Sequence, residues 1–242
     1  MFWQTLVGRV VYRAEGGMRV LQNAHYRWLQ FSDSAIQTLV KRKTPHKPVM
    51  RYLEAFSLAA RLFQGSTCVL GAGGGALLHF LAHEHPDMPL LAIERCPEVL
   101  ELAHTYFALN TLTTTRVLQA DAFDFLKKTK ESFDHLLVDL ANADGLPAAC
   151  YQETFFNDCK RVLNENGILA LNLSTPEYHQ ALLEPLRAVF GEVLNIPIRG
   201  CANIIIFASR ERRILSLLNH AQFSAYFKRI EWVESVGWVG WC

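Results

Sequence analysis

The sequence predicts an α/β protein in which a doubly wound, mostly parallel sheet follows an antiparallel β-meander. From Thr67 onward, apolar runs of strand length alternate with longer runs of helical periodicity. Repeated strand–helix units of this kind require a parallel sheet with helices on both faces. Before that point, the chain shows short β-branched runs separated by turn residues. We therefore expect residues 1–48 to form the meander with its linker, and residues 49–242 to form the α/β domain.

The N-terminal part is expected to hold four strands and then one helix. Charge and two prolines in the stretch 41–48 are typical of an exposed linker. From residue 49 to residue 63, apolar side chains recur at helical spacing, which indicates an amphipathic helix. The four strands are expected near residues 6–14, 18–22, 25–31 and 35–40.

The α/β domain is expected to contain six strands and six helices. The ligands of such a sheet bind at the carboxyl ends of its strands. The aromatic tail after residue 230 fits neither pattern, so it is left unassigned. The expected strands are 67–72, 89–94, 115–120, 133–140, 167–174 and 203–209, and the expected helices are 76–85, 96–109, 122–129, 147–163, 176–190 and 214–229.

Composition excludes several classes of function. A formal net charge of +1 gives no electrostatic signature for nucleic acid or for a membrane surface. The N-terminus lacks the pattern of a signal peptide, and no apolar stretch reaches transmembrane length. The six cysteines show no metal-ligand spacing, so we expect reduced thiols in a cytoplasmic protein. His79 and His83 lie four residues apart, but without a third ligand we interpret them as a solvated helix face and expect no metal.

A glycine cluster joins the first strand of the α/β domain to its helix. Gly71, Gly73, Gly74 and Gly75 let the backbone turn tightly and approach a ligand closely. Glu94 ends the next strand, about twenty residues further on, where a carboxylate accepts hydrogen bonds from ribose hydroxyls. This pattern predicts a nucleoside cofactor, and it leaves open a nicotinamide dinucleotide and S-adenosylmethionine.

Two further strand ends favour an S-adenosylmethionine-type nucleoside. Asp121 follows the third strand, where its carboxylate can accept a hydrogen bond from an adenine amino group and the Ala122 N–H can bond a ring nitrogen. Asp139 ends the fourth strand at the middle of the carboxyl edge, where a reacting group would lie. The glycine loop and these three carboxylates together therefore predict a binding site for an adenosyl group.

The chain resembles the spermidine synthase family from about Gly17 to about Ser209. The matching stretches are AIQT, YLEAF, GAGGGA, AIERCPEVLELA, ADAFDF and VDLANADGLPAACYQETFF. The resemblance implies a Rossmann-like, methyltransferase-type domain after an N-terminal meander, and it implies a homodimer. It also implies that Gln37 contacts the nucleoside, that Tyr52 belongs to the catalytic group, and that Asp139 takes a proton from an amine acceptor. Members of the family transfer an aminopropyl group from decarboxylated S-adenosylmethionine to a diamine.

Departures from the family pattern affect the half of the site that binds the polyamine. The family's glycine loop carries an aspartate for the free amine of the donor, and this chain has Gly74 there. The second aspartate of the fourth-strand stretch is Asn142, with Asp144 nearby across one inserted residue. Arg199 falls near the position of a substrate-site tyrosine, and we expect Asn142 and Arg199 to face the acceptor.

These departures favour methyl transfer from intact S-adenosylmethionine to an unknown small molecule, because Gly74 leaves room for the carboxylate of the methionine tail. For either kind of group transfer, Asp139, Asp144 and Tyr52 are the catalytic candidates. The alternatives are aminopropyl transfer to an amine, hydride transfer with a nicotinamide, and a non-catalytic role as a nucleoside-binding or scaffold protein. Neither a nucleic acid nor a membrane is expected as a partner.

Overall fold

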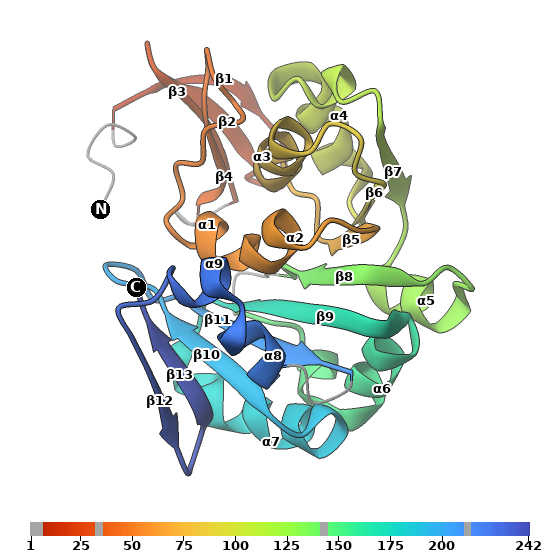
Figure 1. Ribbon diagram of the computed structural model, residues 1–242. Helices are drawn as coiled ribbons and strands as arrows, with labels where there is room; N and C mark the ends of the chain where they lie inside the picture. Colours follow the sequence, from red (N-terminus) through yellow and green to blue (C-terminus); the bar gives the residue numbers. More distant parts are fainter. Residues whose placement is uncertain (1–6, 32–35, 141–144, 211–213) are drawn as a thin grey trace.

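A small antiparallel sheet opens the fold. The computed structural model describes residues 7–31, 36–140, 145–210 and 214–242. The first four strands pair in sequence order, each antiparallel to the next, at the upper left of Figure 1. They are β1 (Arg9–Arg13), β2 (Arg19–Gln22), β3 (Tyr26–Gln30) and β4 (Ile36–Lys41).

This small sheet rests on helix α4 (Pro97–Tyr106). Val20 and Leu29 of the sheet belong to one buried cluster with apolar side chains of that helix. The Tyr12 hydroxyl also donates a hydrogen bond of 2.8 Å to the Glu98 carboxylate. Strand β4 is thereby held beside the rest of the molecule, so that its side chains can complete a site there.

Within the described residues, the large sheet has nine strands in the order β12-β13-β10-β11-β9-β8-β5-β6-β7. Strands β5 to β9 are parallel, as the strand–helix alternation predicts. The winding reverses between β5 and β8, which is where doubly wound sheets bind their ligands. The strands are β5 (Thr67–Leu70), β6 (Leu90–Glu94), β7 (Thr115–Gln119), β8 (Phe133–Val138), β9 (Leu163–Leu173), β10 (Val193–Pro197), β11 (Ile204–Ser209), β12 (Arg229–Val233) and β13 (Gly237–Trp241).

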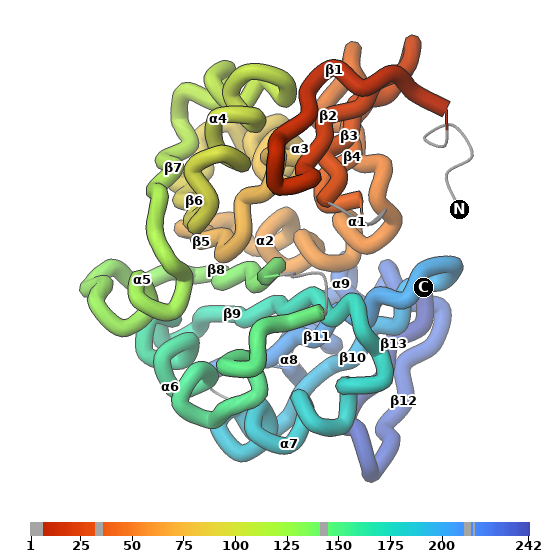
Figure 2. The backbone as a smooth tube through the Cα atoms, turned by 180° about the vertical axis from the view of Figure 1, so that it is seen from behind, coloured from red at the N-terminus to blue at the C-terminus, as the bar shows by residue number. Residues whose placement is uncertain are grey.

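Helices cover both faces of this sheet, as Figures 1 and 2 show from opposite sides. Successive strand residues point to opposite faces, so Val69 enters one buried cluster while Cys68 and Leu70 enter the other. Among the described helices, none is long and apolar enough to cross a membrane. One face carries α1 (Tyr52–Phe56), α2 (Leu58–Leu62), α3 (Ala76–Glu84), α8 (Ile214–Asn219) and α9 (Ala221–Ser224), and the other carries α5 (Ala122–Lys128), α6 (Glu153–Arg161) and α7 (His179–Phe190).

The helix expected over residues 49–63 is divided at Ser57. Helix α1 ends at Phe56 and α2 begins at Leu58. The Ser57 hydroxyl donates to the Leu53 carbonyl at 2.7 Å, and such a bond from a serine to the carbonyl four residues earlier bends helices. The bend leaves Tyr52 on a short helix of its own.

The C-terminal end also differs from the expectation. Instead of one helix over residues 214–229, the chain forms the short helices α8 and α9 and then an antiparallel hairpin, β12–β13. The hairpin extends the large sheet through a parallel pairing of β13 with β10. Trp232 and Trp238 pack edge to face across it, with ring centroids 5.3 Å apart.

Strand β10 was not anticipated, and it changes the geometry around the last predicted strand. It pairs antiparallel with β11, which in turn runs antiparallel to β9. Because β11 is reversed, its first residues lie at the same edge of the sheet as the carboxyl ends of β5 to β9. The stretch just before Ile204 is therefore brought to the predicted ligand-binding edge.

Candidate active site

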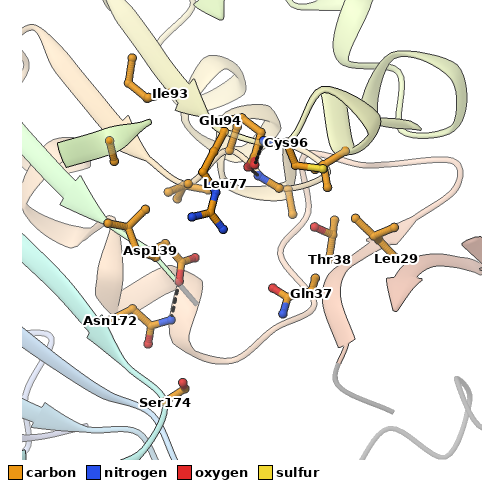
Figure 3. A pocket seen from close by; sticks show the side chains of 18 of the residues that line it. Leu29, Gln37, Thr38, Leu77, Ile93, Glu94, Cys96, Asp139, Asn172 and Ser174 are labelled. Atoms are coloured by element: carbon orange, nitrogen blue, oxygen red, sulfur yellow. Dashed lines mark hydrogen bonds between the residues drawn. The ribbon is translucent and has the colours of Figure 1, made fainter. Parts of the chain in front are cut away.

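A cavity of about 410 Å³ opens at the carboxyl ends of the parallel strands. Strand β4 of the small sheet forms its opposite wall, and Figure 3 shows Gln37 and Thr38 across the space from Asp139 and Asn172. The cavity thus lies between the two sheets. Of the residues predicted from the sequence, those that line it are Gln37, Tyr52, Gly71, Gly73, Glu94, Asp121, Ala122 and Asp139.

The glycine loop brings the end of β5 against the end of β8. Gly71 has φ +94°, and a Cβ built there would lie 2.3 Å from the Asp139 carbonyl oxygen. Only glycine tolerates both this backbone conformation and this approach. The backbone at Asp139 is fixed by a hydrogen bond from its N–H to the Leu70 carbonyl at 2.9 Å.

Glu94 is held in the cavity by two backbone donors. One carboxylate oxygen accepts from the Gly73 N–H at 3.0 Å, and the other accepts from the Cys96 N–H at 2.9 Å. Each oxygen keeps acceptor capacity for a further donor, since a carboxylate can accept about four hydrogen bonds. The arrangement orders the glycine loop and leaves Glu94 able to bind a pair of ribose hydroxyls.

Asp121 has a structural task in addition to the predicted one. Its Oδ1 atom accepts hydrogen bonds from the Phe123 and Asp124 N–H groups at 2.9 and 3.1 Å, which caps the N-terminus of α5. Its second oxygen is the one available to a ligand. The buried Ala122 follows directly and also lines the cavity.

A pair of substitutions separates these two tasks of Asp121. Asp121→Ala should lower the free energy of unfolding by about 1 kcal/mol through loss of the helix cap, and it should weaken nucleoside binding. Asp121→Asn retains a capping oxygen but presents an N–H to the adenine amino group, so it should weaken binding while the melting temperature stays near that of the unchanged protein. Thermal denaturation measures the first effect, and calorimetry with methylthioadenosine, a small adenosyl nucleoside, measures the second. Unchanged binding by Asp121→Asn would show that the adenine amino group does not face this residue.

Asp139 accepts hydrogen bonds on both carboxylate oxygens. The buried Tyr52 hydroxyl donates to one at 2.9 Å, and the Asn172 amide donates to the other at 2.7 Å. Helix α1 supplies Tyr52 and strand β9 supplies Asn172, so three parts of the chain meet at this carboxylate. In Figure 3, the dashed line joins Asp139 to Asn172 at the side of the cavity.

Burial raises the pKa of Asp139, although the hydrogen bonds from Asn172 and Tyr52 act in the opposite direction. Burial together with the negative charge of Asp139 raises the pKa of Tyr52 well above its ordinary value, so Tyr52 remains a neutral donor. A carboxylate with a raised pKa holds a proton more firmly than an ordinary aspartate does. Asp139 is therefore suited to accept a proton from a group that reacts in the cavity.

Gly74 does not line the cavity, and the structure shows what occupies the space beside it. The Gly74 N–H donates to the Thr38 hydroxyl at 2.8 Å. A Cβ added at residue 74 would lie 2.8 Å from the Thr38 methyl group. The free space expected at Gly74 is thus taken by a side chain of β4. This contact removes the steric part of the argument for an intact methionine tail, while residue 74 still carries no carboxylate that would repel one.

Arg199 is the remaining acceptor-side candidate that the structure describes, and its side chain is not among those that line the cavity. It is exposed at the β10–β11 turn, and its carbonyl accepts a hydrogen bond of 3.4 Å from Arg51, next to Tyr52. Gly75, which was expected to bind the cofactor, directly precedes helix α3 with φ +83° and does not line the cavity. Asn142 and Asp144 lie outside the described residues.

Several cavity residues were missed by sequence reasoning. Two of them could have been found from the rule that ligands bind at the carboxyl ends of strands. Asn172 is a polar residue near the end of the buried strand β9, and Ser174 directly follows that strand. Asn203 required knowledge that β11 is reversed. The missed polar residues that line the cavity are Thr38, Arg95, Asn172, Ser174, Thr175 and Asn203.

The interpretation of the histidine pair as a solvated face is wrong for His79. His79 is 4% exposed, and its ring nitrogen bonds the Phe107 carbonyl at 2.7 Å. His83 stacks on His46 of the loop between β4 and α1, with ring centroids 3.8 Å apart. In the part of the chain that the structure describes, no group of three or more His, Cys, Asp or Glu residues is arranged to hold a metal ion.

Comparison with known proteins agrees with this geometry. The profile of the spermine/spermidine synthase domain matches residues 70–205, which is more than half of the chain. The chain belongs to the spermine/spermidine synthase family. A polyamine aminopropyltransferase of Chromobacterium violaceum is 27% identical over 223 residues, covering 90% of this chain and 83% of that protein.

The names of other relatives and of structural neighbours include more than one kind of transferase. The eEF1A lysine and N-terminal methyltransferase of Bos taurus is 29% identical over 152 residues, which cover 57% of this chain and 22% of that protein. The crystal structure of a probable spermidine synthase from Corynebacterium glutamicum superposes with a TM-score of 0.75 at 16% identity, covering 92% of this chain and 86% of that one. The predicted fold class is confirmed, and the expected enzyme class, a transferase that acts with an S-adenosylmethionine-type nucleoside, is supported by these relatives.

Proposed function

We propose that this family member transfers an aminopropyl group from decarboxylated S-adenosylmethionine to an amine acceptor. The observation that carries the proposal is the Tyr52–Asp139 pair, 2.9 Å apart at the cavity and beside the glycine loop. Relatives named polyamine aminopropyltransferases, which align with most of the chain, support it. This proposal replaces methyl transfer, which the sequence alone favours, as the first candidate.

The residues that line the cavity suit the nucleoside half of such a donor. Glu94 would bind the ribose hydroxyls, Asp121 and Ala122 would bind the adenine, and Gln37 would close the opposite wall. Gly71 lets the glycine loop pack against the end of β8, because a Cβ there would collide with the Asp139 carbonyl. Gly71 and Gly73 also line the cavity, where the backbone would lie against the ligand. When bound, the donor supplies a three-carbon group on a positively charged sulfur, which leaves as a neutral thioether.

Asp139 and Tyr52 would act on the acceptor. An amine attacks carbon only when its nitrogen is neutral, and it gains a positive charge as the C–N bond forms and the C–S bond breaks. Asp139 would accept the proton that the nitrogen loses, and its raised pKa favours retention of that proton. Tyr52 would keep the carboxylate turned toward the cavity. Holding amine and donor in line can supply about 7–11 kcal/mol of the barrier.

Methyl transfer remains the second candidate for a specific reason. Residue 74 carries no carboxylate, and the neutral Thr38 hydroxyl stands beside it, so the donor's free amine lacks the partner that the family resemblance would provide. Relatives named methyltransferases also match the chain over part of their length. The two candidates differ in the tail of the nucleoside, and binding can distinguish them.

Calorimetric titration with methylthioadenosine and with S-adenosylhomocysteine compares the spent donors of the two reactions. We expect methylthioadenosine to bind at least about tenfold more tightly, a difference of about 1.4 kcal/mol. We also expect the protein to release methylthioadenosine from decarboxylated S-adenosylmethionine when amines such as putrescine are supplied. Tighter binding of S-adenosylhomocysteine, without aminopropyl transfer to any amine, would overturn the proposal and favour the second candidate.

A further inference from the structure

Two asparagines form a chain of hydrogen bonds that ends at Asp139. Asn203, just before β11, donates from its amide to the Asn172 carbonyl oxygen at 2.8 Å. Asn172 then donates to Asp139 at 2.7 Å. Strands β9 and β11 are paired so that Ile205 lies opposite Asn172, which brings Asn203 to the end of the Asn172 side chain. Both asparagines line the cavity.

The chemistry of the groups gives this chain of bonds a direction. An ionised Asp139 only accepts hydrogen bonds, so it requires the N–H end of the Asn172 amide. The Asn172 oxygen must then point away from Asp139, toward Asn203. There it meets an N–H group of Asn203. With Asn203 in the orientation that the structure shows, a reversed Asn172 would lose this bond and set two oxygens against each other at Asp139.

We propose that Asn203 is a positioning residue that acts through Asn172: by holding the Asn172 oxygen, it keeps an N–H donor facing Asp139. Its significance for catalysis rests on the proposed function, in which Asp139 must be ionised before the acceptor reacts. If Asn172 turned over, its oxygen would face Asp139, and only a protonated Asp139 could make that contact. Asn203 thus favours the form of Asp139 that can act as a base.

Few other groups face Asp139 from the surrounding elements. Helix α1 contributes Tyr52, which stays neutral because burial and Asp139 raise its pKa. The other charged residues that line the cavity within the described ranges are Glu94, Arg95 and Asp121, and no hydrogen bond or ion pair joins them to Asp139 in the structure. The contribution of the two asparagines can therefore be read from the titration of Asp139 itself.

The test is a double-mutant cycle on the ligand-free protein. Asn172→Leu, Asn203→Leu and the double variant remove the amides at nearly constant volume. The readout is the carboxyl carbon resonance of Asp139 in protein labelled at aspartate Cγ, assigned by its absence from Asp139→Asn. We expect Asn172→Leu to raise the titration midpoint by about one pH unit, the size of one lost hydrogen bond to an ionised group. Asn203→Leu should raise it by about half a unit in the native background and should have no effect in the Asn172→Leu background.

The double-mutant cycle has outcomes that contradict the positioning role of Asn203. A shift from Asn203→Leu that persists in the Asn172→Leu background, or no shift in either background, overturns the proposal. If a leucine variant does not fold, Asn172→Ser and Asn203→Ser, which are too short to make these bonds, replace it in the same cycle. The titration needs no turnover, so a protein without aminopropyl transfer still tests the asparagine pair. In an active enzyme, an unchanged titration would refute the positioning role alone.

Discussion

Asp139→Asn is expected to reduce kcat for aminopropyl transfer by about 10²- to 10⁴-fold, the usual contribution of a general base. Asparagine matches the shape of aspartate but cannot accept the proton of the acceptor amine. Methylthioadenosine should still bind, because the predicted nucleoside contacts come from Glu94, Asp121 and Ala122. Single-turnover kinetics with decarboxylated S-adenosylmethionine, together with calorimetry, measure the two effects. Full activity in Asp139→Asn would remove Asp139 from the mechanism.

The pH dependence of kcat/KM provides a control for the role of Asp139 as the base. Because the base must be ionised, kcat/KM should rise with pH through the pKa of Asp139, which burial raises above the ordinary aspartate value. Tyr52→Phe retains the ring but loses the hydroxyl donor at 2.9 Å, so this acid limb should move to higher pH. Asp139→Asn should lose the limb altogether. An acid limb at the same pH in both variants would assign it to another group.

Asp139→Asn should also change how the stability of the protein depends on pH. The folded-state pKa of Asp139 is raised above the unfolded value, so its favourable contribution is complete below the unfolded pKa and is lost as pH rises through the folded pKa. Asparagine carries no such penalty. The stability of Asp139→Asn relative to the unchanged protein should therefore increase as pH rises from acid to neutral. Urea denaturation at several pH values measures it.

The part of the cavity that we propose binds the nucleoside could be predicted because the carboxyl ends of parallel strands share one edge of the sheet. Once strand–helix alternation is recognised, Glu94, Asp121 and Asp139 are expected at the same edge of the sheet, since each lies at or just after the carboxyl end of a parallel strand. The structure places all three along one cavity. The part of the site that follows from strand order alone was therefore available from the sequence.

Other parts of the site depend on contacts that local patterns do not contain. Asn203 reaches the cavity only because β11 is antiparallel, and the sequence pattern of a buried strand does not show its direction. Thr38 of the small sheet contacts Gly74 in the loop between β5 and α3, so nothing near Gly74 in the sequence indicates that its space is filled. The hairpin of β12 and β13 was likewise unassigned, because its glycine and tryptophan residues match neither helical nor strand periodicity.

Glu94→Ala is expected to weaken methylthioadenosine binding by about 100-fold or more, since two charge-assisted hydrogen bonds to ribose hydroxyls are worth about 1.5–3 kcal/mol each. This loss alone would be ambiguous. Glu94 also accepts the Gly73 N–H at 3.0 Å and the Cys96 N–H at 2.9 Å, so its removal disturbs the glycine loop as well.

The ligand can separate these two effects of Glu94. If Glu94 binds the ribose, the unchanged protein should prefer methylthioadenosine over its 2′-deoxy analogue by about tenfold or more, the value of one hydrogen bond to a charged group. Glu94→Ala should bind the two ligands equally, because the partner of the 2′-hydroxyl is gone, whereas loss of the loop alone would weaken both and preserve the preference. Calorimetry on the four combinations gives the coupling between residue and hydroxyl. A preference that survives Glu94→Ala would leave Glu94 with the loop as its only task, and the ribose would have to lie elsewhere in the cavity.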